Sequence, residues 1–331
     1  MMKKINDIIG DAKTIGIAGH VRPDGDCMGS CMSLYNYLKK NRPDLDVRVF
    51  LEFVDKKFNI IENTDQIITT GYDGTKFDLF ISLDTASLDR LGLNLPFYEN
   101  AKRTACIDHH ASNDGYADYN YILPKASSAS EVLYDLLDED LIDKSIAEPM
   151  YMGIAHDSGV FRFQSTTPKT MRIAANMIEK GVNVNMILEE TFFRKTYNQM
   201  MVTAKIQSEA VLALDGKCIY GYCTSEMMEE YGVTTKDLDA VVASIRNVDG
   251  VEVAMFLYQL SEDSYKVSLR SNTRSFTSST ATPPTARNYV DVSKIAVENG
   301  GGGHVRAAGA EIHGELNDII NKLLNRIKQD I

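Results

Sequence analysis

Blocks of apolar and polar positions alternate regularly over the first 185 residues and predict strands and helices in turn. Short apolar runs that end in polar residues predict strands at 13–20, 46–52, 77–84 and 102–110. Apolar positions with helical spacing predict helices at 26–40, 128–137, 146–156 and 167–180. Strands that alternate with helices are typical of an α/β fold built on a parallel sheet.

The pattern changes after this region. Helical spacing continues from Val184 to about Leu212, and no linker rich in Gly, Pro or Ser interrupts it. Further strands are predicted at 217–224, 251–261 and 264–271, and further helices at 234–246, 292–298 and 315–329. We therefore predict an N-terminal domain at 1–185, a helical connector at 186–215, and a smaller α/β domain with a mixed sheet at 216–331. The Ser-, Thr- and Pro-rich stretch 273–289 predicts an exposed loop.

Composition narrows the class of protein. A chain of 331 residues is long enough for two domains, and its net charge of −11 disfavours binding of long duplex nucleic acid. No apolar run is long enough to cross a membrane, and the N-terminus lacks a signal-peptide core. We therefore expect a cytoplasmic protein without membrane partners.

The five cysteines are odd in number and form no C-x-x-C pair, which is typical of reduced thiols. Cys27 and Cys31 are spaced i, i+4 on a predicted helix. Two such cysteines can share a metal, but we predict that they face the core.

Acidic residues and histidines gather in four clusters, three of which follow predicted strands. The clusters are His20-Asp24-Asp26, Asp84, Asp108-His109-His110 and Asp157. Because parallel strands end at one edge of a sheet, we expect five of these side chains to converge: His20, Asp24, Asp26, Asp84 and His109. Several carboxylates in one place need a cation, and oxygen with imidazole ligands suits Mn²⁺, and less exclusively Mg²⁺, Fe²⁺ or Zn²⁺. The number of ligands suits two ions.

Each cluster alone has a simpler interpretation. Asp24 and Asp26 fit a turn with a helix cap, Asp84 a strand-end cap, and Asp157 a turn, while the paired histidines fit a polar loop. Their joint occurrence at strand ends favours the metal site.

The motifs that carry these residues resemble a known family. The stretches "HVRPDGDCMGS", "SLD", "DHH" and "HDSG" resemble the four motifs of the DHH phosphoesterases. The stretch "GGGGHVRAAG" at 300–309 resembles the motif of the DHH-associated C-terminal domain. The resemblance covers nearly the whole chain and is strongest to the stand-alone two-domain type, the NrnA-like nanoRNases and pAp phosphatases (bifunctional oligoribonucleases).

The resemblance implies roles for the matched residues. One Mn²⁺ would be held by His20, Asp24 and Asp84, and a second by Asp26, Asp84, His109 and Asp157. A hydroxide shared by the two ions would be the nucleophile. Asp108 would orient a histidine, and His110 would contact the scissile phosphate or protonate the leaving oxygen.

Substrate contacts are expected in a cleft between the two domains. Arg270 resembles a phosphate-binding arginine, and Gly301, Gly302, Gly303 and His304 would form a phosphate-binding loop. Arg162 and Ser128 are further candidates. The alternative to phosphate binding is that Arg270 is an ordinary surface charge and that the glycines form a flexible loop. The sequence departs from the family pattern at His156, which indicates an altered metal shell, and at 273–289.

The implied activity is Mn²⁺-dependent hydrolysis of short RNA or DNA oligonucleotides to 5′-mononucleotides, or of pAp to AMP. The alternatives are a cyclic-dinucleotide phosphodiesterase, an inorganic pyrophosphatase or exopolyphosphatase, and a nucleotide-binding regulator without turnover. The resemblance also implies a homodimer.

Overall fold

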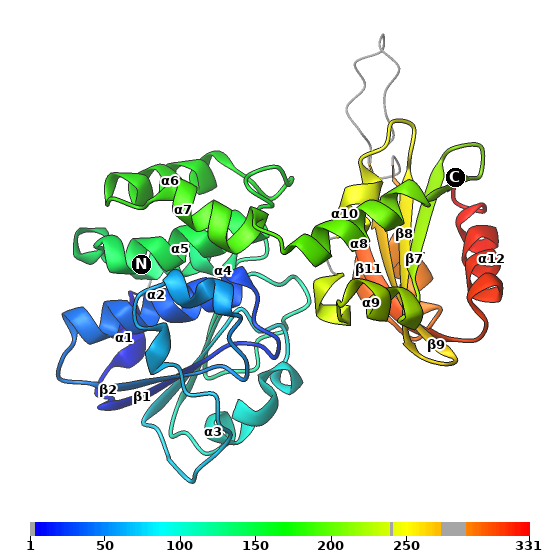
Figure 1. Ribbon diagram of the computed structural model, residues 1–331. Helices are drawn as coiled ribbons and strands as arrows, with labels where there is room; N and C mark the ends of the chain where they lie inside the picture. The colour runs from blue at the N-terminus through cyan, green and yellow to red at the C-terminus, as the bar shows by residue number, and fades with distance from the viewer. Residues whose placement is uncertain (1–3, 239–240, 273–288) are drawn as a thin grey trace. The chain divides into compact units, whose positions relative to one another are not determined.

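The computed structural model describes residues 4–238, 241–272 and 289–331. The chain divides into two compact units, Met1–Arg194 and Lys195–Ile331 (Figure 1). The division lies within the range 186–215 that we assigned to a helical connector. Each unit has its own hydrophobic cores, and each is described by itself.

Unit 1 is built on a five-stranded sheet in which every neighbouring pair is parallel, as predicted. Its order is β2 (Asp46–Phe50), β1 (Thr14–Ala18), β3 (Leu79–Leu83), β4 (Thr104–Asp108) and β5 (Tyr119–Ile122). Strands β3 and β4 are buried along their whole length, which explains their continuous apolar sequence. The edge strand β5 was not predicted, because none of its side chains is fully buried.

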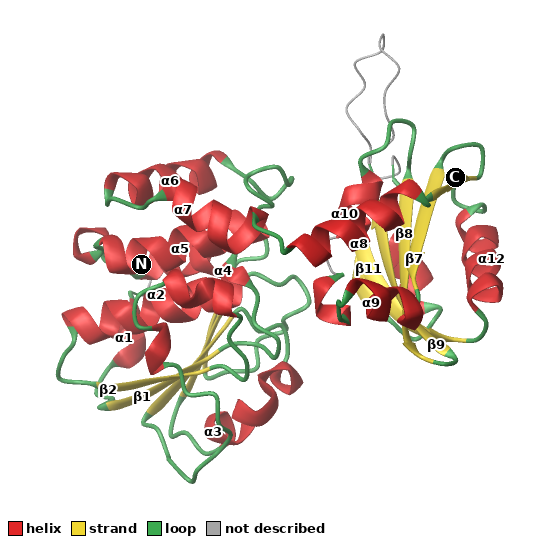
Figure 2. Ribbon diagram, viewed as in Figure 1, coloured by secondary structure: helices red, strands yellow, loops and turns green. Residues whose placement is uncertain are grey.

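Helices cover both faces of this sheet (Figure 2). On one face α2 (Gly25–Asn41) and α4 (Ala129–Leu136) pack against the strands. Outside them, α5 (Lys144–Asp157) packs on α2 and α4, and α6 (Pro168–Glu179) packs on α5. The opposite face is covered by a 3₁₀-helix, Leu88–Asn94, and by α3 (Leu95–Glu99), over an aromatic core that includes Phe50, Phe80 and Phe97. The short helix α1 (Ile5–Ile9) precedes β1, and α7 (Val184–Leu188) with a π-helical turn, Glu189–Phe193, ends the unit.

Helices α2 and α5 cross at two glycines. A Cβ atom at Gly29 would lie 2.4 Å from the carbonyl oxygen of Pro149 and 2.8 Å from the backbone nitrogen of Gly153. A Cβ atom at Gly153 would lie 2.7 Å from Oδ1 of Asp26. The two backbones are therefore in contact at Gly29, where no larger residue fits without moving a helix. A Cβ atom at Gly153 would displace the side chains of Asp26 and Ser130.

Unit 2 contains a six-stranded mixed sheet, also as predicted. Its order is β10 (Gly302–His304), β11 (Ala307–His313), β9 (Ser264–Ser271), β8 (Val253–Ser261), β7 (Cys218–Cys223) and β6 (Val211–Ala213). Only the β7–β8 pair is parallel. Three strands, β6, β10 and β11, were not predicted as strands, and β6 lies where we expected helix to continue.

Helices pack on both faces of the second sheet. The core on one face includes residues of α11 (Val292–Val297) and α12 (Leu316–Ile327). The core on the other includes residues of α8 (Tyr197–Ser208), α9 (Ser225–Tyr231) and α10 (Val241–Arg246). The helix expected at 234–246 is a 3₁₀ turn at Thr235–Asp237 followed by α10. The stretch 273–289 lies, except for its last residue, outside the described residues.

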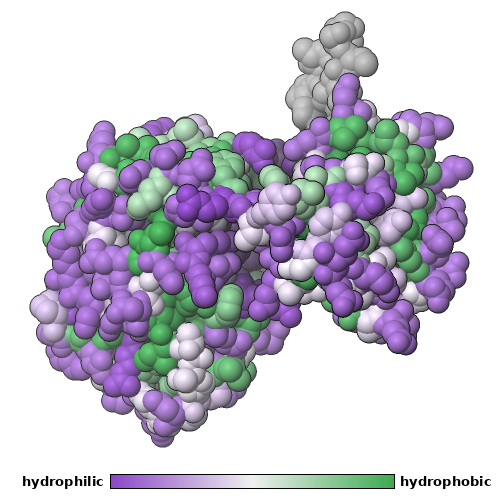
Figure 3. All heavy atoms as spheres, viewed as in Figure 1, coloured by the Kyte–Doolittle hydropathy of each residue, from purple (hydrophilic) through white to green (hydrophobic). Residues whose placement is uncertain are grey.

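Among the described residues, no helix is both long and apolar enough to cross a membrane. The face of the molecule in Figure 3 is mainly hydrophilic, with smaller apolar areas scattered over it. This arrangement is ordinary for a protein surface in water.

A carboxylate at the base of the first sheet ties three strands together. Oδ2 of Asp78 accepts hydrogen bonds from the backbone nitrogens of Lys13 (2.9 Å) and Thr14 (3.1 Å), and Oδ1 lies 2.7 Å from Nζ of Lys102. The ammonium of Lys102, followed by these two backbone hydrogen bonds, lowers the pKa of Asp78 below its usual range.

Replacing Asp78 by asparagine should destabilise the protein by about 1–2 kcal/mol at pH 7, because charge-assisted hydrogen bonds are lost. A depressed pKa stabilises the fold above the unfolded-state pKa of about 3.9, and this contribution is lost as the pH falls through the folded-state value. Urea denaturation of both proteins should therefore show a difference that shrinks below about pH 4. The exposed Asp114→Asn serves as the control, and an equal loss there would contradict the assignment.

Candidate metal centre

Three strands of the first sheet deliver polar side chains to the same edge. His20 lies two residues after β1, Asp84 directly follows β3, and Asp108 is the last residue of β4. The register pairs Ala18 with Ser82 and Leu83 with Ile107, so the three strands end together. Strand β1 lies between β2 and β3, so the strand order reverses beside β1. In open α/β sheets, ligands bind outside the carboxyl ends of the strands at such a reversal.

Asp84 lies at the centre of the cluster. It is only 3% exposed, and its backbone adopts φ 51°, in the left-handed region that few residues other than glycine adopt. Its Oδ2 lies 3.5 Å from Nε2 of His20, and its Oδ1 lies 3.5 Å from Nε2 of His109 and 3.6 Å from Nδ1 of His110. Burial acts to raise the pKa of Asp84, but His109 and His20 outweigh it and hold the pKa below its usual range. Aspartate and asparagine adopt this region more readily than most other residues.

His20 and Asp24 lie on one side of Asp84. Nδ1 of His20 lies 2.8 Å from the carbonyl oxygen of Val21, which can only accept, so Nδ1 carries a proton and Nε2 is the nitrogen available to a metal ion. Nε2 also lies 3.8 Å from Oδ1 of Asp24. Asp24 caps α2 as well, since Oδ1 accepts from the backbone nitrogens of Asp26 and Cys27. Asp24 therefore caps the helix, as its sequence context alone suggested, and also lies close to His20, as expected of a metal ligand.

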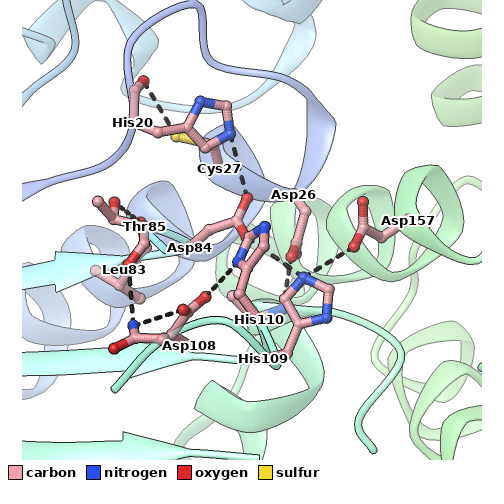
Figure 4. Close-up of polar contacts among 12 residues, drawn as sticks. His20, Asp26, Cys27, Leu83, Asp84, Thr85, Asp108, His109, His110 and Asp157 are labelled. Atoms are coloured by element: carbon pink, nitrogen blue, oxygen red, sulfur yellow. Dashed lines mark hydrogen bonds and ion pairs between the residues drawn. The ribbon is translucent and has the colours of Figure 1, made fainter. Parts of the chain in front are cut away.

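Asp26, His109 and Asp157 lie on the other side (Figure 4). The carboxylate of Asp26 is fully buried and accepts from the backbone nitrogens of Ala129 (2.5 Å) and Ser130 (3.0 Å) at the start of α4. Nε2 of His109 lies 3.0 Å from Oδ2 of Asp157. Burial, followed by the negative charges of Asp84 and Asp157, raises the pKa of Asp26 well above its usual range.

His110 and Asp108 form a pair beside the cluster. Nδ1 of His110 lies 2.8 Å from Oδ1 of Asp108, and Oδ2 of Asp108 accepts from the side-chain nitrogen of Asn113 at 2.7 Å. The histidine that Asp108 orients is therefore His110, whose Nε2 faces away from the carboxylate. Asn113, which also donates to the carbonyl oxygen of Thr85, was not identified from the sequence because nothing in a polar loop marks it as buried.

The donor set fits divalent cations. Among the described residues, three overlapping groups bring potential ligand atoms within 4.8 Å of one another: His20-Cys27-Asp84, Asp84-His109-His110 and Asp26-His109-Asp157. Oδ1 of Asp84 is buried and has no hydrogen-bond partner. A buried, unsatisfied carboxylate oxygen among further carboxylates is stabilised when a cation binds it.

Three predictions on unit 1 need correction or comment. Ser128 is fully buried and caps α4 by accepting from the backbone nitrogen of Glu131, so it offers no surface to substrate. Nε2 of His156 lies 2.9 Å from Oγ1 of Thr191, and its ring packs on Phe58 and Phe192. His156 is thus absent from the three groups above and supports the fold next to Asp157. Arg162 is exposed in the turn that follows Asp157.

In unit 2 the glycine run leads into a short edge strand: Gly300 and Gly301 precede β10, and Gly302 and Gly303 begin it. Gly302–His304 forms β10, and a Cβ atom at Gly303 would lie 2.6 Å from the carbonyl oxygen of Ala307. Gly303 therefore allows close packing of β10 on β11, and β10 itself is exposed. Phosphate binding by Gly301, Gly302, Gly303 and His304 stays a prediction. The register places His304 opposite Ala307 and Ala307 opposite Arg270, so His304 and Arg270 share one face of the sheet with a small residue between them.

Comparison with known proteins agrees with this architecture. The profile described as "DHH family, N-terminal domain" matches residues 14–154, and that of the DHHA1 domain matches residues 215–330. The "Bifunctional oligoribonuclease and PAP phosphatase NrnA" of Thermus thermophilus is 30% identical, over 96% of this chain and 90% of that protein. The protein of the same name in Bacillus subtilis is 26% identical, over 91% of this chain and 90% of that protein.

A solved structure shares the fold over both units. The exopolyphosphatase-related protein of Bacteroides fragilis superposes with a TM-score of 0.85 at 22% identity, covering 98% of this chain and 95% of that chain.

Fold, site and relatives together define the class, a metal-dependent hydrolase of phosphate esters. The chain belongs to the DHH family, and its second unit carries the DHHA1 domain. The family resemblance inferred from the motifs is thereby confirmed.

Proposed function

We propose that this phosphoesterase uses Mn²⁺ to hydrolyse short oligonucleotides to 5′-mononucleotides and to remove the 3′-phosphate of pAp. The observation that carries the proposal is the buried carboxylate of Asp84, placed between His20 and His109 with one oxygen unsatisfied. The names of the relatives support the substrate class, since they describe an oligoribonuclease and a PAP phosphatase. The net charge of −11 favours small substrates over long nucleic acid.

Each of two ions would have its own ligands, except that Asp84 would belong to both sets. His20, Asp24 and Asp84 would hold one, and Asp26, Asp84, His109 and Asp157 the other. When bound, such ions lower the pKa of water and neutralise charge on a phosphate group. Oxygen and imidazole ligands suit Mn²⁺.

His110 would supply the proton that the reaction needs. As water oxygen attacks phosphorus, the bond from phosphorus to the leaving oxygen breaks, and that oxygen must be protonated. Nδ1–H of His110 donates a hydrogen bond to Oδ1 of Asp108, so Nε2 is the atom that would face the leaving oxygen. Burial acts to lower the pKa of His110, but the hydrogen bond to Asp108 and its negative charge outweigh burial and raise the pKa, which favours the protonated imidazole.

Unit 2 would bind the phosphate that is not hydrolysed. Arg270 and His304 lie on one face of the second sheet, and a guanidinium forms two parallel hydrogen bonds to a phosphate.

Replacing Arg270 by glutamine should raise KM for an oligonucleotide by about 10–100-fold, because a hydrogen bond between charged groups is lost. Steady-state kinetics on a dinucleotide would measure this effect. Lys266→Gln, on the same face of β9, is the matched control and should leave KM unchanged. An unchanged KM in the Arg270 variant would remove this residue from the substrate site.

The proposed function is tested by one panel of substrates in Mn²⁺: pApA, a short RNA, pAp, cyclic di-AMP and pyrophosphate. Release of AMP from pApA and pAp, with pyrophosphate unchanged, would support the proposal. Preferential cleavage of cyclic di-AMP would support a cyclic-dinucleotide phosphodiesterase instead. Turnover of pyrophosphate alone would contradict the proposal and support the pyrophosphatase alternative.

A further inference from the structure

Cys27 places a sulfur atom at the edge of the metal centre. It lies in the first turn of α2, it is fully buried, and its Sγ is 3.8 Å from the carbonyl oxygen of His20. Cys27, His20 and Asp84 can each offer a ligand atom within 4.8 Å of the others, and all three are buried. Figure 4 shows the thiol of Cys27 directly beside the imidazole of His20.

The local fold explains this position. Asp24 fixes the start of α2, and the next turn directs Asp26 toward α4 and Cys27 toward the end of β1. A Cβ atom at Gly19 would lie 2.2 Å from Sγ of Cys27 and 3.2 Å from Sγ of Cys31, so the glycine makes room for both thiols. The sequence predicted that both cysteines face the core. Both are buried, but of the two only Cys27 belongs to a group of potential metal ligands.

The donors around this position differ in kind from those of the second group. His20 offers an imidazole nitrogen, Asp84 a carboxylate oxygen and Cys27 a sulfur. The group formed by Asp26, His109 and Asp157 offers oxygen and nitrogen alone. Thiolate ligands favour Zn²⁺ and other borderline-soft ions, whereas oxygen ligands favour Mn²⁺ and Mg²⁺.

We propose that Cys27 is a direct ligand of the ion held by His20, Asp24 and Asp84, and that it makes this position prefer Zn²⁺, Co²⁺ or Fe²⁺ over Mn²⁺. The inference rests on the proposed two-ion centre and deepens it. The second position, without sulfur, remains suited to Mn²⁺. The centre therefore holds two different ions, with the thiophilic ion bound more tightly.

Cobalt reports the ligand directly. Metal-stripped, full-length protein is titrated with Co²⁺ under reducing, oxygen-free conditions, and its absorption spectrum is followed. The wild type should develop a near-ultraviolet sulfur-to-cobalt charge-transfer band with the first equivalent. Cys27→Ser should bind cobalt without this band, and Cys31→Ala is the matched control that should keep it. Zn²⁺ affinity, measured by competition with a chelator, should fall by about 10–100-fold in Cys27→Ser while Mn²⁺ affinity holds, since loss of even a supporting group has effects of this size.

Each further outcome is decisive. A wild-type cobalt complex with ligand-field bands but no charge-transfer band overturns ligation by Cys27 and leaves the metal centre standing. Loss of the band in Cys31→Ala but not in Cys27→Ser also overturns it. Absence of any cobalt uptake by the wild type overturns the proposed centre itself. Cys27→Ala is the second variant if Cys27→Ser does not fold, as judged by circular dichroism.

Discussion

Asp84→Asn should lower phosphoesterase turnover by about 10³-fold or more and abolish binding of at least one metal ion. The carboxylate is shared by both proposed ligand sets, and metal ions contribute several kcal/mol to charge stabilisation in such reactions. Asparagine is the appropriate replacement because, like aspartate, it tolerates the left-handed backbone at φ 51°. A loss of function in this variant is then caused by the missing carboxylate and not by a change of fold.

The measurement combines bound metal, determined after dialysis, with the turnover of pApA. Asp89→Asn, an exposed carboxylate five residues away, is the matched control and should behave like the wild type. Retention of both ions with turnover within tenfold of the wild type would remove Asp84 from the centre. If the wild type itself binds nucleotide without turnover, and Asp84→Asn leaves nucleotide affinity unchanged, the chain is a nucleotide-binding regulator.

His110→Gln should lower kcat by about 10²–10⁴-fold while leaving metal content unchanged, because a general acid contributes about this much. The defect should shrink on a substrate with a good leaving group, such as a p-nitrophenyl ester, whose leaving oxygen needs no proton. Asp108→Asn keeps the histidine but loses its orientation, so a smaller loss of about 10–100-fold is expected.

Kinetics with the two substrates separate the possible roles of His110. An equal loss on both substrates would indicate that His110 contacts phosphate and does not donate a proton. Loss of metal along with activity would instead make it a metal ligand. Its Nδ1 lies 3.6 Å from Oδ1 of Asp84, so this outcome has a clear structural cause.

The convergence of the metal-binding candidates was predictable from sequence because it depends on chain direction. Continuous apolar runs before Asp84 and Asp108 predicted parallel strands, and parallel strands end at one edge. His20 and His109 meet Asp84 for the same reason, whereas Asp26 is held by the backbone nitrogens of α4. Residues that follow strands are placed by topology alone, which a periodic pattern reveals.

Interactions that depend on packing between distant segments were not predictable. Ser128 and Asp26 both serve the start of α4, yet nothing near Ser128 in the sequence marks it as buried. His156 bonds to Thr191, 35 residues away, and so differs from the metal-shell role we expected. Strand β10 was missed because glycine has low strand propensity, and here close contact with β11 overrides that propensity.

The crossing of α2 and α5 has a mechanical consequence. Backbone contact at Gly29 and Gly153 fixes how closely Asp26 and Asp157 approach, since each glycine lies within one helical turn or so of its carboxylate. Side chains at a helix crossing adjust their rotamers when temperature or neighbouring residues change, whereas backbones in contact do not. The distance between these two carboxylates should therefore stay constant on heating and when other core residues are substituted. It should change abruptly when a single methyl group is added at the crossing.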